Sequence, residues 1–147
     1  MSLFAYIIAV VAGGLINCQT GSNSQLKKSL GNALPALIVN YIVGGTAAFV
    51  YTFGKRVPVP AAAKAAEAPW WAWTGGLFGA AYGLTAILLA SQMGAATLTA
   101  LVVTGQLVSS VLIDHFGWIG FDVHPASWPR IAGCALMVLG LGLIAKF

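Results

Sequence analysis

Single amide and tyrosine side chains interrupt long apolar runs in this sequence. Gln106 lies near the centre of one run and Tyr82 lies near the centre of another. An amide both donates and accepts hydrogen bonds, and a tyrosine ring can stack on a planar or cationic solute. We therefore predict that both residues bind a solute. The alternatives are a hydrogen bond between helices for Gln106 and aromatic packing for Tyr82.

A second polar group lies near the N-terminus, where Asn17, Gln19 and Asn23 follow an apolar run. Gln19 and Asn23 are four residues apart, so they share one face if the first helix is continuous. In that case we expect the three amides to line a wetted vestibule that binds the solute. If the helix instead ends near Cys18, the same residues form an exposed loop. Asn40, in the next apolar run, is expected to hold helices together.

An acid and an imidazole, Asp114 and His115, are adjacent at the end of a later apolar run. Ionisable groups close to the membrane are functional candidates, and histidine changes charge near neutral pH. The pair could therefore gate the protein or couple it to protons. The structural alternative is that Asp114 pairs with Arg130 at the start of the next helix and fixes the loop between them.

The elements that carry these residues must be built for a bilayer. Only 7% of the 147 residues are charged, against roughly 25% in a soluble domain, and 59% are hydrophobic. This composition excludes a soluble enzyme and a disordered chain. The net charge of +4 is scattered, which argues against a nucleic-acid partner. The sequence has no Ser-His-Asp set, phosphate loop or metal-spaced Cys/His cluster, so we expect no catalytic residue, metal or cofactor.

Five stretches approach the roughly 20 apolar residues that a spanning helix needs. The expected fold is an all-α transmembrane five-helix bundle, a single integral membrane domain over residues 1–147. Asn32 is placed to cap the second helix, and the short segment Ser91–Gly94 makes the third and fourth spans a hairpin. The predicted spans cover residues 3–26, 33–53, 70–91, 94–113 and 128–146.

Three glycines in the third span lie four residues apart: Gly75, Gly79 and Gly83. Small residues at this spacing let two helix backbones approach closely. We predict a helix-packing ridge here, either within one subunit or between two subunits.

The basic residues are almost evenly divided between the two sides that five spans define. One side receives Lys55, Arg56, Lys64 and Arg130, and the other receives Lys27, Lys28 and Lys146. An excess of Lys and Arg in cytoplasmic loops sets orientation, and here the excess is one residue. We therefore expect insertion in both orientations and an antiparallel, inverted ten-helix homodimer. Pairing with an oppositely oriented paralogue remains the alternative.

Several motifs together resemble the YdcZ-like family of small five-span proteins in the drug/metabolite transporter superfamily. The resemblance covers nearly the whole chain. Its markers are Gln19-x-x-x-Asn23-x-x-Leu26, Trp71-x-Trp73-x-Gly75-Gly76, Met93-Gly94-Ala95-Ala96, Gly105-Gln106, Ile113-Asp114-His115-Phe116-Gly117 and Arg130-x-x-Gly133. The resemblance implies an antiparallel dimer of five-helix halves that transports a small molecule. More distant relatives, the small multidrug transporters, carry an acidic residue in the first helix; here that helix has neutral Asn17, Gln19 and Asn23, which argues against simple proton/cation antiport.

These observations predict a multi-pass protein of the bacterial inner membrane, with the lipid bilayer, a small solute and a second copy as its partners. The predicted function is transport by alternating access through a midplane cavity. The rival functions are a passive channel for a small solute or ion and a non-transporting accessory membrane subunit.

Overall fold

The computed structural model describes residues 2–146, and all of its regular elements are helical. The long helices are α1 (Leu3–Leu30), α2 (Ala33–Gly54), α4 (Gly75–Phe116) and α5 (Trp128–Lys146). Short elements lie in the connections: α3 (Ala62–Ala66) and the 3₁₀ turns η1 (Trp70–Thr74) and η2 (Trp118–Gly120). The prediction of an all-helical fold is confirmed. The limits of the membrane spans themselves stay predictions.

Four apolar stretches of the described chain are long enough to cross a bilayer, and one of them is about twice the necessary length. It runs from Trp70 to Phe116 and includes all of α4. The 42 residues of α4 would extend about 63 Å as one straight helix, against a hydrocarbon core of about 30 Å. The backbone leaves helical geometry at Gly94, with φ 78° and ψ 166°. Gly94 therefore divides this stretch in two, which gives five apolar helical segments.

The conformation of Gly94 belongs to a region of φ/ψ space that is essentially restricted to glycine. The sequence predicts a four-residue connection at Ser91–Gly94. In the structure, helix continues through Met93, and the break is confined to the single glycine.

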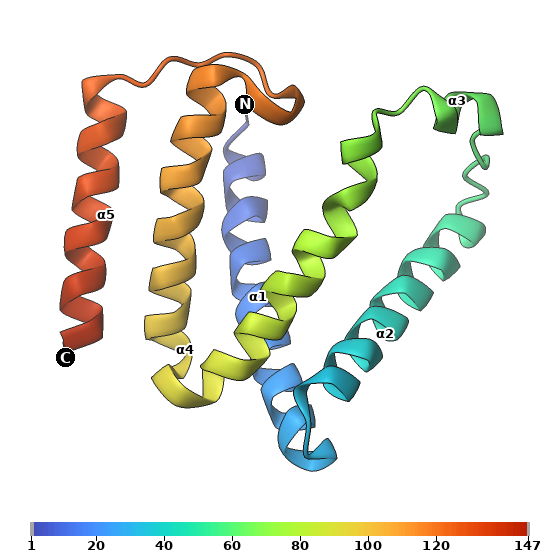
Figure 1. The fold of residues 1–147 in the computed structure, drawn as a ribbon, viewed down its shortest axis with the longest axis horizontal. Helices are drawn as coiled ribbons and strands as arrows, with labels where there is room; N and C mark the ends of the chain where they lie inside the picture. Colours follow the sequence, from blue (N-terminus) through green and yellow to red (C-terminus); the bar gives the residue numbers. More distant parts are fainter. Residues whose placement is uncertain (1, 147) are drawn as a thin grey trace. The chain divides into compact units, whose positions relative to one another are not determined.

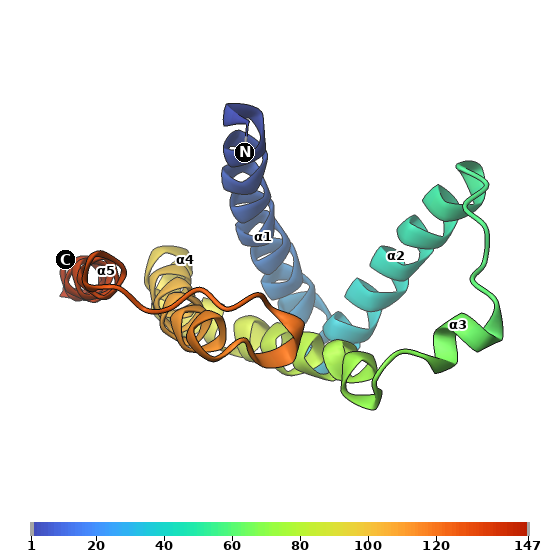
Figure 2. The same cartoon turned by 90° about the horizontal axis from the view of Figure 1, so that it is seen from above.

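The chain forms two compact units, Met1–Gln92 and Met93–Phe147. In the first unit, α1 and α2 are joined by a tight turn at Gly31, whose φ of 72° ends α1. The Asn32 side chain then accepts a hydrogen bond of 2.9 Å from the backbone N–H of Leu34, as its expected role as the α2 cap requires. Figures 1 and 2 show α1, α2 and the first part of α4 close together near this turn and splayed away from it.

The small core of the first unit lies where these helices converge. Buried residues from α2 and α4 make this core, with Leu26 of α1 and Leu84 of α4 packed against it: Ala33, Ala36, Leu37 and Ile87. Most other apolar side chains of the chain are exposed. In a membrane protein, this exposed apolar surface faces lipid tails or another protein.

In the second unit, the last part of α4 and α5 run side by side (Figures 1 and 2). The loop between them includes η2 and ends at Ser127, whose carbonyl accepts a hydrogen bond of 3.0 Å from the N–H of Ile131. This bond starts α5, near the start that the sequence predicts.

The break at Gly94 generates a test with a matched control. Gly94→Ala places a Cβ in a glycine-only conformation and should cost about 1–3 kcal/mol of folding free energy. Gly105→Ala lies inside the helical part of α4, where a Cβ would meet open space, and alanine favours helix. In thermal unfolding of detergent-purified protein, we expect a lower midpoint for Gly94→Ala alone. Equal midpoints for the two variants would contradict the assigned break.

Candidate functional site

Two amides join α1 to α2 in the first unit. Gln19 donates a hydrogen bond from Nε2 to Oδ1 of Asn40, with 2.9 Å between the two atoms. Gln19 lies eleven residues, or about 17 Å, from the end of α1, which is far enough to reach the middle of a 30 Å core. Asn40 was expected to hold helices together, and this bond joins α1 to α2. The bond also places Asn40 next to Gln19, one of the three predicted site amides of α1.

Helix α1 continues without a break from Leu3 to Leu30. The alternative in which it ends near Cys18 is therefore wrong, and Gln19 and Asn23 share one helix face. Asn17 is exposed on the same helix, and the Thr20 hydroxyl donates to the carbonyl of Ile16. The use of these amides by a solute stays a prediction.

Asn23 is the buried polar residue of the first unit, with 9% of its surface exposed. Its side-chain amide makes no hydrogen bond with another described residue. Among the described residues, the fully buried side-chain polar atom without a partner is Oγ1 of Thr104, so the oxygen and nitrogen of the Asn23 amide reach the surface. A water molecule or a ligand outside the chain can therefore bond to this amide.

Gly79 and Gly83 lie against α2. A Cβ at Gly83 would come within 2.9 Å of Cδ1 of Leu37, and one at Gly79 would come within 3.1 Å of the Tyr41 hydroxyl oxygen. A Cβ at Gly75 would meet open space. The close approach thus involves two of the three predicted glycines, and it joins two helices of one subunit.

Tyr41 is a polar residue at the contact between α2 and α4 that the sequence analysis did not single out. Its hydroxyl lies on the glycine face of α4, one residue from Asn40, and it makes no hydrogen bond with another described residue. The available signal was its position directly after Asn40, facing a helix with small residues at Gly79 and Gly83. Tyr82, which was predicted to bind a solute, is 39% exposed on α4 of the same unit, and its role stays a prediction. Gln106 is exposed in the second unit.

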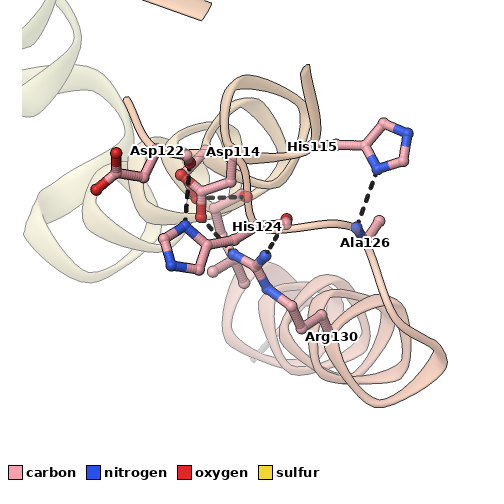
Figure 3. A network of polar contacts seen from close by, with 8 residues as sticks. Asp114, His115, Asp122, His124, Ala126 and Arg130 are labelled. Carbon is pink, nitrogen blue, oxygen red and sulfur yellow. Dashed lines mark hydrogen bonds and ion pairs between the residues drawn. The ribbon is translucent and has the colours of Figure 1, made fainter. Parts of the chain in front are cut away.

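A polar network closes the end of the second unit (Figure 3). Arg130 at the start of α5 donates from Nη2 to Oδ2 of Asp114 over 2.5 Å and from Nη1 to the carbonyl oxygen of His124 over 2.8 Å. The backbone N–H of His124 donates to the carbonyl oxygen of Asp114 over 2.8 Å. Arg130 and Asp114 thereby tie both helix ends to the loop, in the arrangement of the structural alternative.

His115 points to a different part of the same loop. Its Nδ1 accepts a hydrogen bond of 3.0 Å from the backbone N–H of Ala126 (Figure 3). An imidazole that accepts at Nδ1 carries its proton at Nε2, so this geometry assigns the neutral Nε2–H tautomer. A doubly protonated ring could not accept this bond. The coupling or gating role of Asp114 and His115 stays a prediction.

Within residues 2–146, no three His, Cys, Asp or Glu side chains are grouped in a way that could hold a metal ion.

Comparison with known proteins places nearly the whole sequence in one family. The model of the family described as "Putative inner membrane exporter, YdcZ" matches residues 4–143. The chain belongs to this YdcZ family. It is also 25% identical over 142 residues to the inner membrane protein YdcZ of Escherichia coli strain K12, with 97% of this chain and 93% of that protein covered. No solved structure matches.

Membership of the YdcZ family and the apolar helices agree on where the protein is found. It is a multi-pass protein of the inner membrane. The family match includes the amides of α1 and α2 in the first unit and the polar network around Arg130 in the second unit.

The glycine contact generates a stability prediction. Gly83→Val should push against the buried Leu37 side chain and cost about 1–3 kcal/mol through overpacking. Gly76→Val, where a Cβ meets open space, is the matched control for the valine side chain itself. We expect a lower thermal midpoint in detergent for Gly83→Val only, with partial recovery on adding Leu37→Ala. No difference between the two valine variants would overturn the contact.

The ion pair generates a double-mutant cycle. Arg130 and Asp114 keep 34% and 24% of their side-chain surface exposed, so solvent screens their attraction. We expect a coupling energy of at most about 1 kcal/mol between Arg130→Gln and Asp114→Asn, measured by thermal unfolding. The loop should also become more accessible to protease in either single variant. Zero coupling together with an unchanged cleavage rate would show that the pair does not fix the loop.

Proposed function

We propose that this protein is a membrane transporter that moves a small molecule by alternating access through a midplane cavity, as a dual-topology antiparallel homodimer. The family description supports export as the direction of transport. In this proposal, amides and tyrosines of the spans line the cavity.

The observation that carries the proposal is the Gln19–Asn40 pair, which lies within the apolar helices of a chain whose side chains are mostly exposed. Both residues remain partly exposed, and the most apolar window of α1 has no buried residue. Amides facing lipid tails would each cost several kcal/mol on cyclohexane-type scales. A second copy that encloses these amides with water removes the cost, and it also covers the apolar faces that the single chain leaves open.

The balance of basic residues supports an inverted second copy. Four Lys or Arg residues lie on one side and three on the other when the five spans alternate. With this bias, both orientations should insert. Two inverted copies have the symmetry of the inverted repeats that place transporter sites near the midplane. Because the copies are identical, the inward-open and outward-open states exchange the conformations of the two halves and have equal energies.

The passive channel and the accessory subunit are the rival functions. In proteoliposomes containing purified protein alone, a channel passes solute without saturation at modest concentrations. An accessory subunit passes none. The proposed transporter gives a saturating flux that a gradient of a second solute accelerates.

A pair of charge-biased variants tests the inverted dimer. The first variant, Lys28→Gln with Lys146→Gln, leaves the excess of basic residues on the side of Lys55. The second variant leaves the excess on the side of Lys27, and it combines Lys55→Gln, Arg56→Gln and Lys64→Gln. Each variant should insert in one orientation. We expect little solute efflux from cells that express either variant alone and near wild-type efflux when both are co-expressed.

The control for expression and folding is the amount and thermal midpoint of each variant in detergent. Full efflux from either variant alone, with its uniform orientation verified, would contradict the inverted dimer. Full efflux only on co-expression would also exclude a requirement for a paralogue.

A further inference from the structure

The amides of α1 and α2 also indicate what kind of molecule the cavity accepts, an inference that rests on the proposed function. We propose that the ligand is an uncharged polar solute that carries both hydrogen-bond donors and acceptors, bound by Asn23, Gln19 and Asn40. The argument rests on unused hydrogen-bonding capacity and on where the charges of the chain lie.

Asn23 supplies the strongest observation. Its side chain is about nine-tenths buried, it shares a face with Gln19, and its amide makes no hydrogen bond with another described residue. The amide has two N–H donors and an oxygen with two acceptor sites. Its oxygen and nitrogen reach the surface, since the fully buried side-chain atom without a partner among the described residues is Oγ1 of Thr104. A partner outside the chain can therefore bond to both the donors and the acceptor of this amide.

The Gln19–Asn40 pair leaves both kinds of hydrogen-bonding group free. Their mutual bond uses one N–H of Gln19 and one acceptor site of Asn40. The Gln19 oxygen and the Asn40 NH₂ group remain available. The bond also fixes the orientation of both amides, so α1 and α2 present donors and acceptors at set positions. A ligand with only one kind of group would leave half of them unpaired.

The placement of charge excludes a cation as the preferred ligand. The chain has three acidic residues: Glu67 ends α3, Asp114 pairs with Arg130, and Asp122 lies in the α4–α5 loop. Helices α1 and α2, which carry the amides, contain no acidic residue. A cation bound at these amides would therefore have no opposite charge on either helix to pair with.

An anion is also disfavoured at this position. Lys27 and Lys28 lie in the last turn of α1, where cations compensate the negative end of the helix dipole. The negative end of the helix dipole repels an anion, and it offsets the positive charge of the two lysines. Neutral amides in a low-dielectric setting then match a neutral ligand, because a buried charge without an opposite partner is far more costly.

Two matched sets of compounds test the charge preference on purified full-length protein. The planar set is nicotinamide, nicotinate and 3-picolylamine, and the polyol set is glucose, gluconate and glucosamine. At neutral pH each set contains an uncharged, an anionic and a cationic member. We expect the uncharged member of at least one set to bind at least tenfold more tightly than its charged relatives, measured by thermal shift and equilibrium dialysis. Tighter binding of a charged member, or no binding of either uncharged member, would overturn the proposal.

Asn23→Leu separates binding from folding. Because this variant removes an amide without a hydrogen bond in the chain, the thermal midpoint should stay the same or rise, while affinity for the uncharged compound falls about tenfold. Gln25→Leu, two residues away on the opposite face of α1, is the control and should change neither value. Asn23→Asp should shift preference towards the amine of the same set. A destabilised Asn23→Leu with unchanged affinity would show a purely structural role.

Binding and transport fail independently in this design. Charge-selective binding with no flux in proteoliposomes would overturn the proposed transport function and leave the ligand assignment standing. Flux of a charged compound, with no binding of an uncharged one, would overturn the ligand assignment and leave the proposed transport function standing.

Discussion

The thickness of the hydrocarbon core is the constraint on which the rest of this structure depends. Backbone groups inside it must bond to one another, so the chain crosses as helix and can stop only near the interfaces. Gly31 and Gly94 end helical segments in conformations with positive φ. With the break at Gly94, each of the five apolar helical segments is long enough for about one crossing. The depth of each polar side chain in the membrane then follows from the number of residues between it and the end of its helix.

The same constraint gives the amides their importance. In water, Gln19 and Asn40 would be unremarkable surface residues, whereas in hydrocarbon each needs a partner. Their hydrogen bond partly satisfies both and joins α1 to α2 beyond the small core around Ile87. Asn23 lies one turn further along the same face of α1. Its amide has no hydrogen-bond partner among the described residues, and its polar atoms reach the surface.

Much of the fold could be predicted from the sequence because apolar length and turn chemistry are local signals. Asn32 caps α2 as expected, and α5 begins close to its predicted start. The short helix α3 was missed because five residues give too little periodicity, although Ala62–Ala66 is rich in alanine, the strongest helix former. The continuity of α1 through its polar residues was one of two open alternatives, since amides occur both in loops and in buried helix faces.

The candidate site was less predictable, because it depends on which helix faces meet. Sequence spacing placed Gln19 and Asn23 on one face, but it could not identify Asn40 as the partner of Gln19 or place Tyr41 against Gly79. The pairing of Asp114 with Arg130 was one of two open alternatives, and it could be anticipated because opposite charges at two adjacent helix ends have few other partners. Gln106 and Tyr82 were predicted from their chemistry and their depth in the spans, and their use by a solute stays a prediction, because depth does not decide which way a side chain faces.

The orientation of the chain in native membranes is the most direct test of the central claim. Cys18→Ala and Cys134→Ala remove both cysteines, and Ser2→Cys then places a single thiol before α1. A membrane-impermeant maleimide applied to intact cells, followed by lysis and a second label, measures the fraction of molecules with an external N-terminus. The inverted dimer predicts that about half of the molecules are labelled from outside. Labelling of all molecules, or of none, would contradict it.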